Sequence, residues 1–148
     1  MGKFVTTFEG LADAIVSECL IFPPADLDKG EEIKEYYHTN SAAWDTGAGS
    51  VVISPKVAQA LSLSSRGRAI ISGAGGDKEG DVCRVHIGLP SGELFENVEV
   101  VVDELPDYDI LLGMPIISQM DFAITHPNGN TKFTYERPSK RDLDFTKE

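Results

Sequence analysis

Cationic side chains are scarce in this sequence. Its 148 residues include 13 Lys and Arg against 24 Asp and Glu, which gives a formal net charge of −11. A chain this acidic is repelled by phosphate backbones and by anionic membrane surfaces. We therefore expect no nucleic-acid partner and no membrane partner.

Long apolar runs are also missing. The apolar stretch 11–22 is interrupted by Asp13 and Glu18, so it lacks the continuous apolar segment of a signal peptide. No run in the sequence approaches the roughly 20 apolar residues that a membrane helix needs. We therefore predict a cytoplasmic protein.

Cysteine is nearly absent. The two cysteines, Cys19 and Cys83, lie far apart, and neither belongs to a CxxC pair. This spacing favours two reduced cysteines within strands or the core. A single disulfide stays open as an alternative if the protein is exported.

Patterns that bind metals or phosphate groups are absent too. The histidines are His38, His86 and His126. They are scattered without metal-ligand spacing, and Asp142-x-Asp144 lacks the Gly and Glu of a calcium loop. Gly73-x-Gly75 has Lys78 where a dinucleotide-binding loop would carry its third glycine. We expect no metal and no cofactor.

Short β-prone runs dominate what is present. The chain is long enough for one domain with a core, and its apolar fraction of 41% is ordinary for a globular protein. Val, Ile, Thr and aromatic residues gather in runs bounded by Gly, Pro and Asn, as they do in strands. These runs are 14–22, 33–39, 51–53, 69–71, 82–89, 94–102, 110–112, 122–125 and 132–135.

Helix signals are few. Ser54-Pro55 combines an N-cap with a first helical position, which predicts a short helix over 56–63. Pro115 predicts a second helix over 115–120. Asn128-Gly129 between apolar runs is a strong hairpin signal. The sequence therefore predicts an all-β protein, a small closed or folded-over sheet with one or two short helices.

Asp45 is the residue that this pattern does not explain. It lies between the apolar runs 42–44 and 51–53, where an ionised carboxylate costs several kcal/mol if it is buried alone. Thr46 and Gly47 suit a tight turn, since Gly47 permits backbone shapes that other residues resist. A carboxylate at such a turn can act as a general base. Hydrolysis through a water, however, needs two carboxylates in different protonation states.

Three motifs in order resemble the aspartic proteases of the retropepsin (retroviral) type. The segment 45–48, Asp-Thr-Gly-Ala, is similar to their active-site signature. The segment 70–76, Ile-Ile-Ser-Gly-Ala-Gly-Gly, resembles their glycine-rich flap, and 109–113, Asp-Ile-Leu-Leu-Gly, resembles their second hallmark. The resemblance covers roughly 33–135 and is closer to bacterial members than to viral enzymes.

The resemblance implies roles for individual residues. Asp45 would be the catalytic aspartate, within an active-site loop that continues through Thr46, Gly47 and Ala48. Thr46 would join two such loops by hydrogen bonds, and Gly47 would let the substrate backbone approach. The flap over the cleft would carry Gly73, Ala74, Gly75 and Gly76. Leu111, Leu112 and Gly113 would pack behind the catalytic loop.

A second chain is part of the same expectation. The sequence contains a single Asp-Thr-Gly, whereas pepsin-like enzymes carry two such motifs in a chain about twice as long. The resemblance therefore implies a homodimer in which two Asp45 carboxylates meet on a two-fold axis and act on a peptide or protein substrate. We expect an N-terminal arm over 1–13, the protease domain over 14–136 and a charged C-terminal tail over 137–148.

Two departures from the family pattern keep alternatives open. Met114-Pro115 stands where retroviral enzymes usually carry Arg followed by Asn or Asp, and the flap lacks an aromatic residue. The main alternative is an inactive, protease-like dimer that binds peptides or assembles complexes. Another is a protease held as a monomer until its termini are trimmed. In the plainest reading, Asp45 only caps a turn, and Asp107 and Asp109 bound a loop rather than form a second acid pair.

Overall fold

The structure, a computed structural model, describes residues 2–73 and 75–147. Strands make up most of its regular elements, so the predicted all-β class is confirmed. The strands are β1 (Gly2–Thr7), β2 (Val16–Phe22), β3 (Tyr37–Trp44), β4 (Val51–Ile53), β5 (Arg68–Gly73), β6 (Gly76–Gly88), β7 (Leu94–Val102), β8 (Ile110–Leu112), β9 (Asp121–Thr125) and β10 (Lys132–Arg137). The helices are α1 (Pro55–Ala60) and α2 (Met114–Ile117), with 3₁₀ turns at Leu27–Lys29 and Pro127–Gly129.

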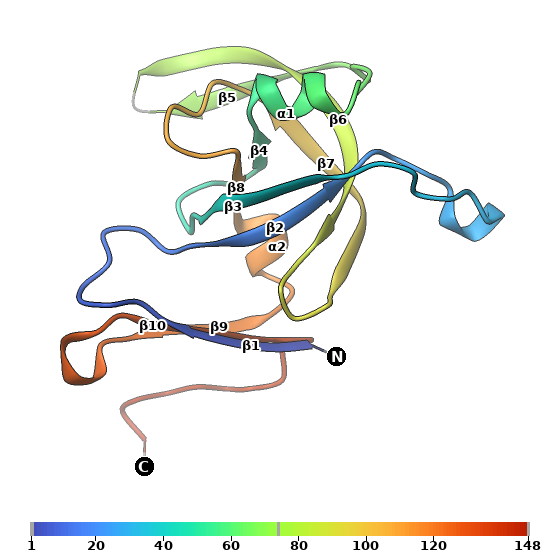
Figure 1. Ribbon diagram of the computed structural model, residues 1–148. Coiled ribbons are helices and arrows are strands. Elements are labelled where there is room, and N and C mark those ends of the chain that lie inside the picture. The colour runs from blue at the N-terminus through green and yellow to red at the C-terminus, as the bar shows by residue number, and fades with distance from the viewer. Residues whose placement is uncertain (1, 74, 148) are drawn as a thin grey trace.

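Six strands close into a barrel. The larger sheet has the order β2-β3-β8-β4-β7-β6-β5, and an added pairing of β2 with β6 closes the ring of the first six. β5 lies outside this ring and continues β6 as a hairpin above the barrel (Figure 1). The expected small closed barrel is therefore confirmed.

The short strands β8 and β4 lie side by side in the barrel wall, between β3 and β7. β8 runs parallel to β3, pairing Trp44 with Leu112, and antiparallel to β4, pairing Val52 with Leu111. β4 in turn runs parallel to β7. β8 therefore separates β3 from β4, and the loop that joins those two strands must pass the end of β8.

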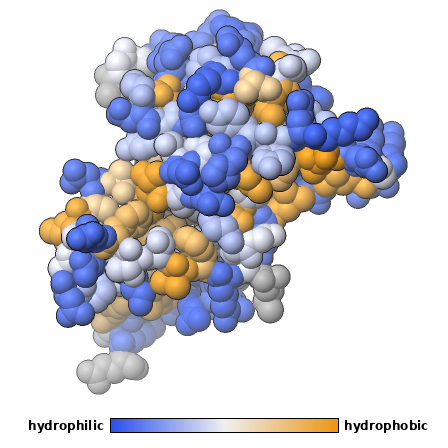
Figure 2. All heavy atoms as spheres, in the orientation of Figure 1, coloured by the Kyte–Doolittle hydropathy of each residue, from blue (hydrophilic) through white to orange (hydrophobic). Residues whose placement is uncertain are grey.

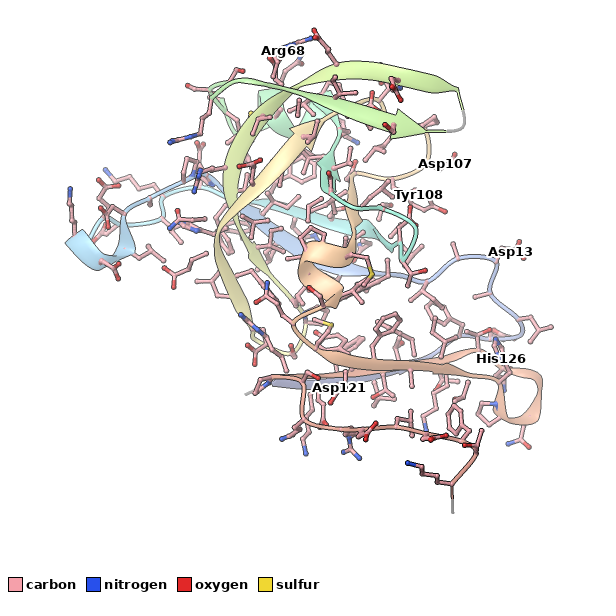
Figure 3. All side chains as sticks on the ribbon, turned by 180° about the vertical axis from the view of Figure 1, so that it is seen from behind. Asp13, Arg68, Asp107, Tyr108, Asp121 and His126 are labelled. Atoms are coloured by element: carbon pink, nitrogen blue, oxygen red, sulfur yellow. The ribbon has the colours of Figure 1, made fainter. Side chains whose placement is uncertain are left out.

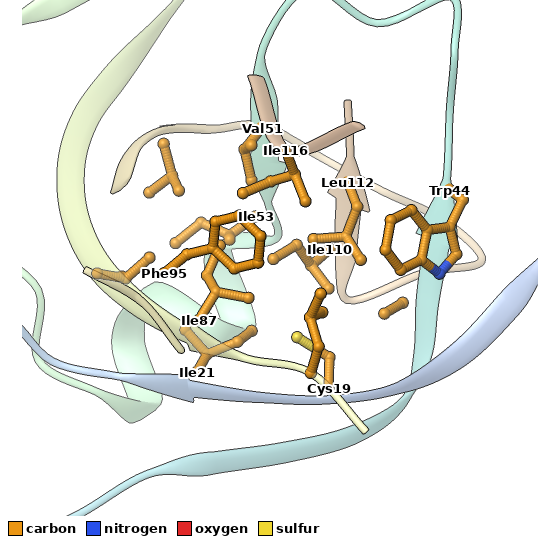
Figure 4. Packing of buried hydrophobic residues seen from close by; sticks show 14 of the residues in the cluster. Cys19, Ile21, Trp44, Val51, Ile53, Ile87, Phe95, Ile110, Leu112 and Ile116 are labelled. Atoms are coloured by element: carbon orange, nitrogen blue, oxygen red, sulfur yellow. The ribbon is translucent and has the colours of Figure 1, made fainter. Parts of the chain in front are cut away.

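The hydrophobic core includes residues from both of these short strands. Every residue of β4 is buried, as expected for a central strand covered on both faces. The two cysteines are buried and unbonded, Cys19 among the packed side chains of Figure 4. The largest fully buried side chains are Phe133, Ile21, Ile53, Ile87, Ile110, Leu112, Ile116, His86, Val51, Val57, Val85 and Val100.

The helix signals predicted the starts of helices better than their ends. Ser54 caps α1, its Oγ accepting a hydrogen bond from the Val57 N–H at 3.4 Å, with Pro55 at the first turn. α1 ends at Ala60 rather than residue 63, and Ser62 takes a left-handed backbone with φ of 50°. α2 is likewise a single turn, shorter than the predicted 115–120.

The N-terminal segment is more ordered than the expected arm. β1 pairs antiparallel with β10, and β10 pairs with β9, so the two ends of the chain share a three-stranded sheet. Phe4 packs on Tyr135 with ring centroids 5.3 Å apart. Residues 1–13 show little periodicity of their own, because this strand is formed by pairing with residues more than 120 positions away. The β9–β10 hairpin at Asn128-Gly129 is confirmed.

The C-terminal tail is fastened to this sheet. The Asp121 carboxylate accepts hydrogen bonds from Ser139 Oγ at 2.5 Å and from the backbone N–H groups of Lys140 and Arg141 at 2.7 and 2.8 Å. Arg141 also pairs with the buried Glu136 at 2.6 Å. Figure 3 labels Asp121 where the tail turns beneath the sheet.

Two strand starts differ most from the expected ones. β3 begins at Tyr37, not near residue 33, and its register with β2 shifts between Thr39 and Ala42, where a kink was expected. β6 begins at Gly76 and includes the polar segment 77–80, whereas the sequence predicted this strand only over 82–89. None of the helices in residues 2–73 and 75–147 is long and apolar enough to span a membrane.

Candidate active site

Asp45 lies where β3 ends and the loop to β4 begins. Its backbone N–H donates to the Leu112 carbonyl at 3.0 Å, which extends the β3–β8 pairing by one residue. Its carbonyl accepts from the Ala48 N–H at 3.2 Å, which closes a turn over 45–48. The barrel therefore fixes the Asp45 backbone on one side by a strand and on the other by a turn. The loop 45–50, which carries the candidate catalytic aspartate, is called the catalytic loop below.

The Asp45 carboxylate is half-buried, and one oxygen is held in place. Oδ1 accepts a hydrogen bond from the Gly47 N–H at 2.9 Å. Within the part of the chain that the structure describes, Oδ2 has no hydrogen-bond partner. One oxygen is thus oriented by the loop, and the other is available to a further group.

Gly47 serves this arrangement by its size. Its φ lies outside the left-handed region, so the expected need for an unusual backbone shape was wrong. A Cβ built on Gly47 would lie 3.3 Å from Asp45 Oδ1, a tight contact beside the N–H that orients this oxygen. The glycine leaves space next to the carboxylate.

Trp44 anchors the strand that carries Asp45. Its Nε1 donates to Ser17 Oγ at 3.0 Å, and its ring packs 5.2 Å from Phe133 and 5.5 Å from Tyr135, centroid to centroid. The side chain therefore fills the space between barrel and three-stranded sheet. Asp45 is the first residue after β3, so it directly follows a side chain that is packed on both sides.

Thr46 behaves differently from its neighbours. It is exposed, and its hydroxyl has no hydrogen-bond partner among the described residues of the same chain. Its expected bond to a second copy stays a prediction.

The second hallmark packs directly behind the catalytic loop. A Cβ on Gly113 would lie 2.3 Å from the Ser50 carbonyl oxygen and 2.6 Å from that of Ala48. The N–H of Met114, at the start of α2, donates to the same Ala48 carbonyl at 2.8 Å. Only glycine fits this contact. Leu111 and Leu112 complete the support within β8.

The predicted flap is the hairpin of β5 and β6. Gly73 pairs with Gly76, and Gly76 takes a left-handed φ of 99°, as a tight hairpin turn requires. Gly75 lies in this turn, and Ala74 lies outside the described residues. The structure thus forms the hairpin; its action as a lid stays a prediction.

Asp109 has a role that the sequence did not reveal. Its carboxylate accepts from Thr39 Oγ1 at 2.6 Å and pairs with Lys56 Nζ at 3.0 Å. These bonds tie the start of β8 to β3 and to α1. Asp109 is therefore occupied structurally, whereas Asp107 is exposed in the loop after β7 (Figure 3). Tertiary contacts alone distinguish these two acids.

No cluster of three or more His, Cys, Asp or Glu side chains that could hold a metal occurs in residues 2–73 and 75–147. The groups gathered around Asp45 are a carboxylate, backbone N–H groups and small residues. Such a set can hold and deprotonate a water molecule, provided that an acid is brought beside it.

Comparison with known proteins gives a likeness to one solved structure and a match to one family. A solved retropepsin-like aspartic protease from Rickettsia conorii is similar, with a TM-score of 0.40 and 15% identity over 84% of this chain and 96% of that one. No curated protein sequence matches significantly. A profile of the gag-polyprotein putative aspartyl protease family matches residues 37–119, more than half of the chain and all of the site described above. The chain therefore belongs to this family of retropepsin-like aspartic proteases.

Proposed function

We propose that this protein is an aspartic endopeptidase, which hydrolyses peptide bonds through a water activated by the paired Asp45 carboxylates of a homodimer. The observation that carries the proposal is the Asp45 carboxylate itself. Oδ1 is held by the Gly47 N–H at 2.9 Å, while Oδ2 has no partner among the described residues. The close packing of Gly113 holds the loop that presents this carboxylate.

A second copy supplies the acid that one chain lacks. The sequence contains a single Asp-Thr-Gly, and Asp109 is already engaged by Thr39 and Lys56. When two Asp45 carboxylates approach on a two-fold axis, both cannot easily be ionised, so the pair shares one proton. One copy then acts as base while the other acts as acid.

Exposed apolar residues support a dimer on the side of the catalytic loop. Figure 2 shows apolar side chains gathered on the lower left, where residues 8–15 lie in Figure 1, below the catalytic loop. Leu11 is 71% exposed, and Met114, whose N–H binds the catalytic loop, is 39% exposed. An apolar Met114 in place of the family's usual arginine favours contact between copies by burial rather than by charge.

The reaction follows from the shared proton. The ionised Asp45 takes a proton from a water, whose oxygen then attacks the carbonyl carbon of the peptide. The protonated Asp45 of the other copy donates its proton to the carbonyl oxygen. A tetrahedral diol results. The carboxyl that is now protonated donates a proton to the amide nitrogen, while the ionised one takes a proton from a diol hydroxyl. The C–N bond breaks, a carboxylic acid and an amine leave, and the pair again holds one proton.

The substrate would bind as an extended strand. β5 is the outer strand of its sheet, and an extended peptide can pair with such an edge. Peptide or protein substrates are therefore part of the proposal. A cytoplasmic location stays a prediction from the sequence.

The test is peptide cleavage by the wild type and by Asp45→Asn. Asparagine keeps the volume and an oxygen for the Gly47 N–H, but it cannot act as a general base. Activity should fall by about 10²-fold or more. Asp28→Asn, which removes an exposed carboxylate from the turn after β2, is the matched control and should retain full activity.

Oligomeric mass is the companion measurement. Sedimentation should show a dimer at concentrations where cleavage is observed. Equal cleavage by wild type and Asp45→Asn, or cleavage by a strict monomer, contradicts the proposal. Stoichiometric peptide binding without turnover at any pH would instead support the alternative of an inactive peptide-binding or assembly module.

A further inference from the structure

The flap stands clear of the barrel. β6 pairs with β7 only from Val82 onward. Among the described residues, 68–73 and 76–81 therefore have each other as sheet partners, which makes them a two-stranded ribbon (Figure 1). An isolated hairpin of this kind is marginally stable. Contacts between the ribbon and the barrel must decide where it rests.

The side-chain contacts on the outer face of the ribbon join its two strands to each other and to the turn before β5. Arg68 pairs across the strands with Asp81 at 3.0 Å and with Glu79 at 3.8 Å. Ser65 Oγ also donates to Asp81 at 3.0 Å. These bonds join β5 to β6 and to the turn before β5. They stiffen the hairpin without attaching it to the barrel.

The base of the inner face lies directly on β7 at Gly80. A Cβ built there would be 2.6 Å from the Val102 carbonyl oxygen and 2.9 Å from Val101 Cγ1. Only a residue without a side chain allows the ribbon to approach this closely. Gly80 therefore marks the point about which the outer part of the ribbon would turn.

An ion pair joins the same inner face to the barrel two residues further out. Lys78 Nζ lies 3.0 Å from Asp103 Oδ1, and Asp103 directly follows β7. Asp103 is itself fixed: its N–H donates to the Ile53 carbonyl at 3.0 Å, and Oδ1 accepts from the Glu104 N–H at 2.8 Å. Its side chain is 18% exposed and that of Lys78 58%. A mostly exposed cation on the flap thus pairs with a hydrogen-bonded, mostly buried anion on the barrel.

We propose that the Lys78–Asp103 pair is a latch, which holds the flap against the barrel and breaks when the flap turns about Gly80. The Asp103 backbone is hydrogen-bonded to β4, the strand that follows the catalytic loop. The latch therefore fixes the position of the flap relative to the candidate active site. A cavity of about 260 Å³ beside the pair, bounded by Ile71 and Gly73, leaves room beneath the hairpin. Lys78 and Asp103 are thus positioning residues, because they act through the flap.

The latch is weak enough to open repeatedly. A partly exposed ion pair shifts an equilibrium by up to about fivefold and is screened by salt. The flap should therefore open more often at high ionic strength. The significance for peptide access rests on the proposed function, but the motion itself needs no substrate.

Amide hydrogen exchange on the full chain measures this motion directly. Lys78→Met keeps most of the aliphatic stem and removes the charge; Asp103→Asn keeps an oxygen for the Glu104 N–H. Each variant should speed exchange in residues 70–80 about two- to fivefold, and the double variant should add nothing further. Salt at 0.5 M should speed exchange more in the wild-type flap than in the variants, which lack the latch but keep the Arg68 pairs.

Two controls make the result specific. Lys34→Met removes an exposed lysine from the loop between β2 and β3 and should not alter flap exchange. Gly80→Ala, whose Cβ would meet the Val102 carbonyl, should lift the ribbon and speed flap exchange as well. Exchange in β4 and β8 should stay constant in the two latch variants.

Several results would overturn the latch. These are unchanged flap exchange in both single variants, additive effects in the double variant, or equal acceleration throughout the barrel. The outcome is separable from catalysis. If the chain cuts no peptide but shows the expected exchange pattern, the latch stands and the proposed activity is wrong. If it cuts peptide but flap exchange is unchanged in the variants, the proposed activity stands and the latch is wrong.

Discussion

Replacing Gly113 by alanine tests how closely the second hallmark supports the catalytic loop. The new Cβ would lie 2.3 Å from the Ser50 carbonyl oxygen and 2.6 Å from that of Ala48. Non-bonded carbon atoms pack at roughly 3.5 Å, so these backbone atoms would have to retreat by about 1 Å. Neither atom is the end of a flexible side chain. The catalytic loop or the start of α2 must therefore move.

The size of the effect follows from this overlap. Added atoms in a tightly packed site cost about 1–3 kcal/mol, and a contact against backbone belongs to the upper half of that range. We expect about 2–3 kcal/mol of lost stability, which lowers the melting temperature by about 4–12 °C for a chain of this size. Cleavage should fall as well, because Asp45 is held by the same loop.

Gly49→Ala is the matched control within the same loop. A Cβ on Gly49 has no atom within 4 Å, and its φ lies outside the left-handed region. Its effect should stay within about 0.5 kcal/mol. Thermal or denaturant unfolding is compared at equal protein concentration, since a dimer gains stability with concentration. If Gly113→Ala has the same free energy of unfolding as Gly49→Ala, the loop does not depend on Gly113 and the reasoning fails.

Three further predictions concern the core, the thiols and the tail. Trp44→Phe leaves Ser17 Oγ, now 3.0 Å from the indole N–H, without its donor, and should cost about 1–3 kcal/mol in denaturant unfolding; Tyr36→Phe, at an exposed aromatic, should cost little. Burial raises the pKa of Cys19 to about 12 and also raises that of Cys83, so neither thiol should react with a thiol reagent until the protein unfolds; rapid labelling of native Cys19 would contradict the packed barrel. The pKa of Asp121 lies below its ordinary 3.8, because its carboxylate accepts hydrogen bonds from the Lys140 N–H first, and then from Ser139 and Arg141. The pKa of Glu136 lies below its ordinary 4.5, mainly because of its hydrogen bond with Arg141. Because both pKa values are lower in the folded state, tail attachment is complete above these ordinary values and is lost as the pH falls below them. Amide exchange of residues 139–147 should therefore accelerate below about pH 4, and an unchanged pH profile in Asp121→Asn would refute this account.

The candidate site was predictable where its chemistry is local. Asp45, Thr46 and Gly47 are adjacent in sequence, and the turn they form needs no distant residue for its hydrogen bonds. Ser54-Pro55 predicted the start of α1 for the same reason. The purpose of Gly47 was not predictable, since its contact with the Asp45 carboxylate depends on side-chain placement rather than on backbone preference.

Contacts between distant segments escaped prediction. β1 carries no periodic pattern, and its existence depends on β10 at the other end of the chain. Asp109 and Asp107 look alike in sequence, yet only Asp109 meets Lys56 and Thr39. The latch pair Lys78 and Asp103 is likewise invisible until β6 and β7 are placed side by side.

The sequence alone determined the family and the all-β class, and it singled out Asp45 as the candidate catalytic residue. These depend on short motifs and on local alternation, which few residues specify. Only the tertiary structure decided the closure of the barrel through β2 and β6, the sheet that joins both ends of the chain, and the support of the catalytic loop by Gly113. Each of these is a pairing of distant segments, whose free energy depends on many side chains packing at once rather than on any one stretch.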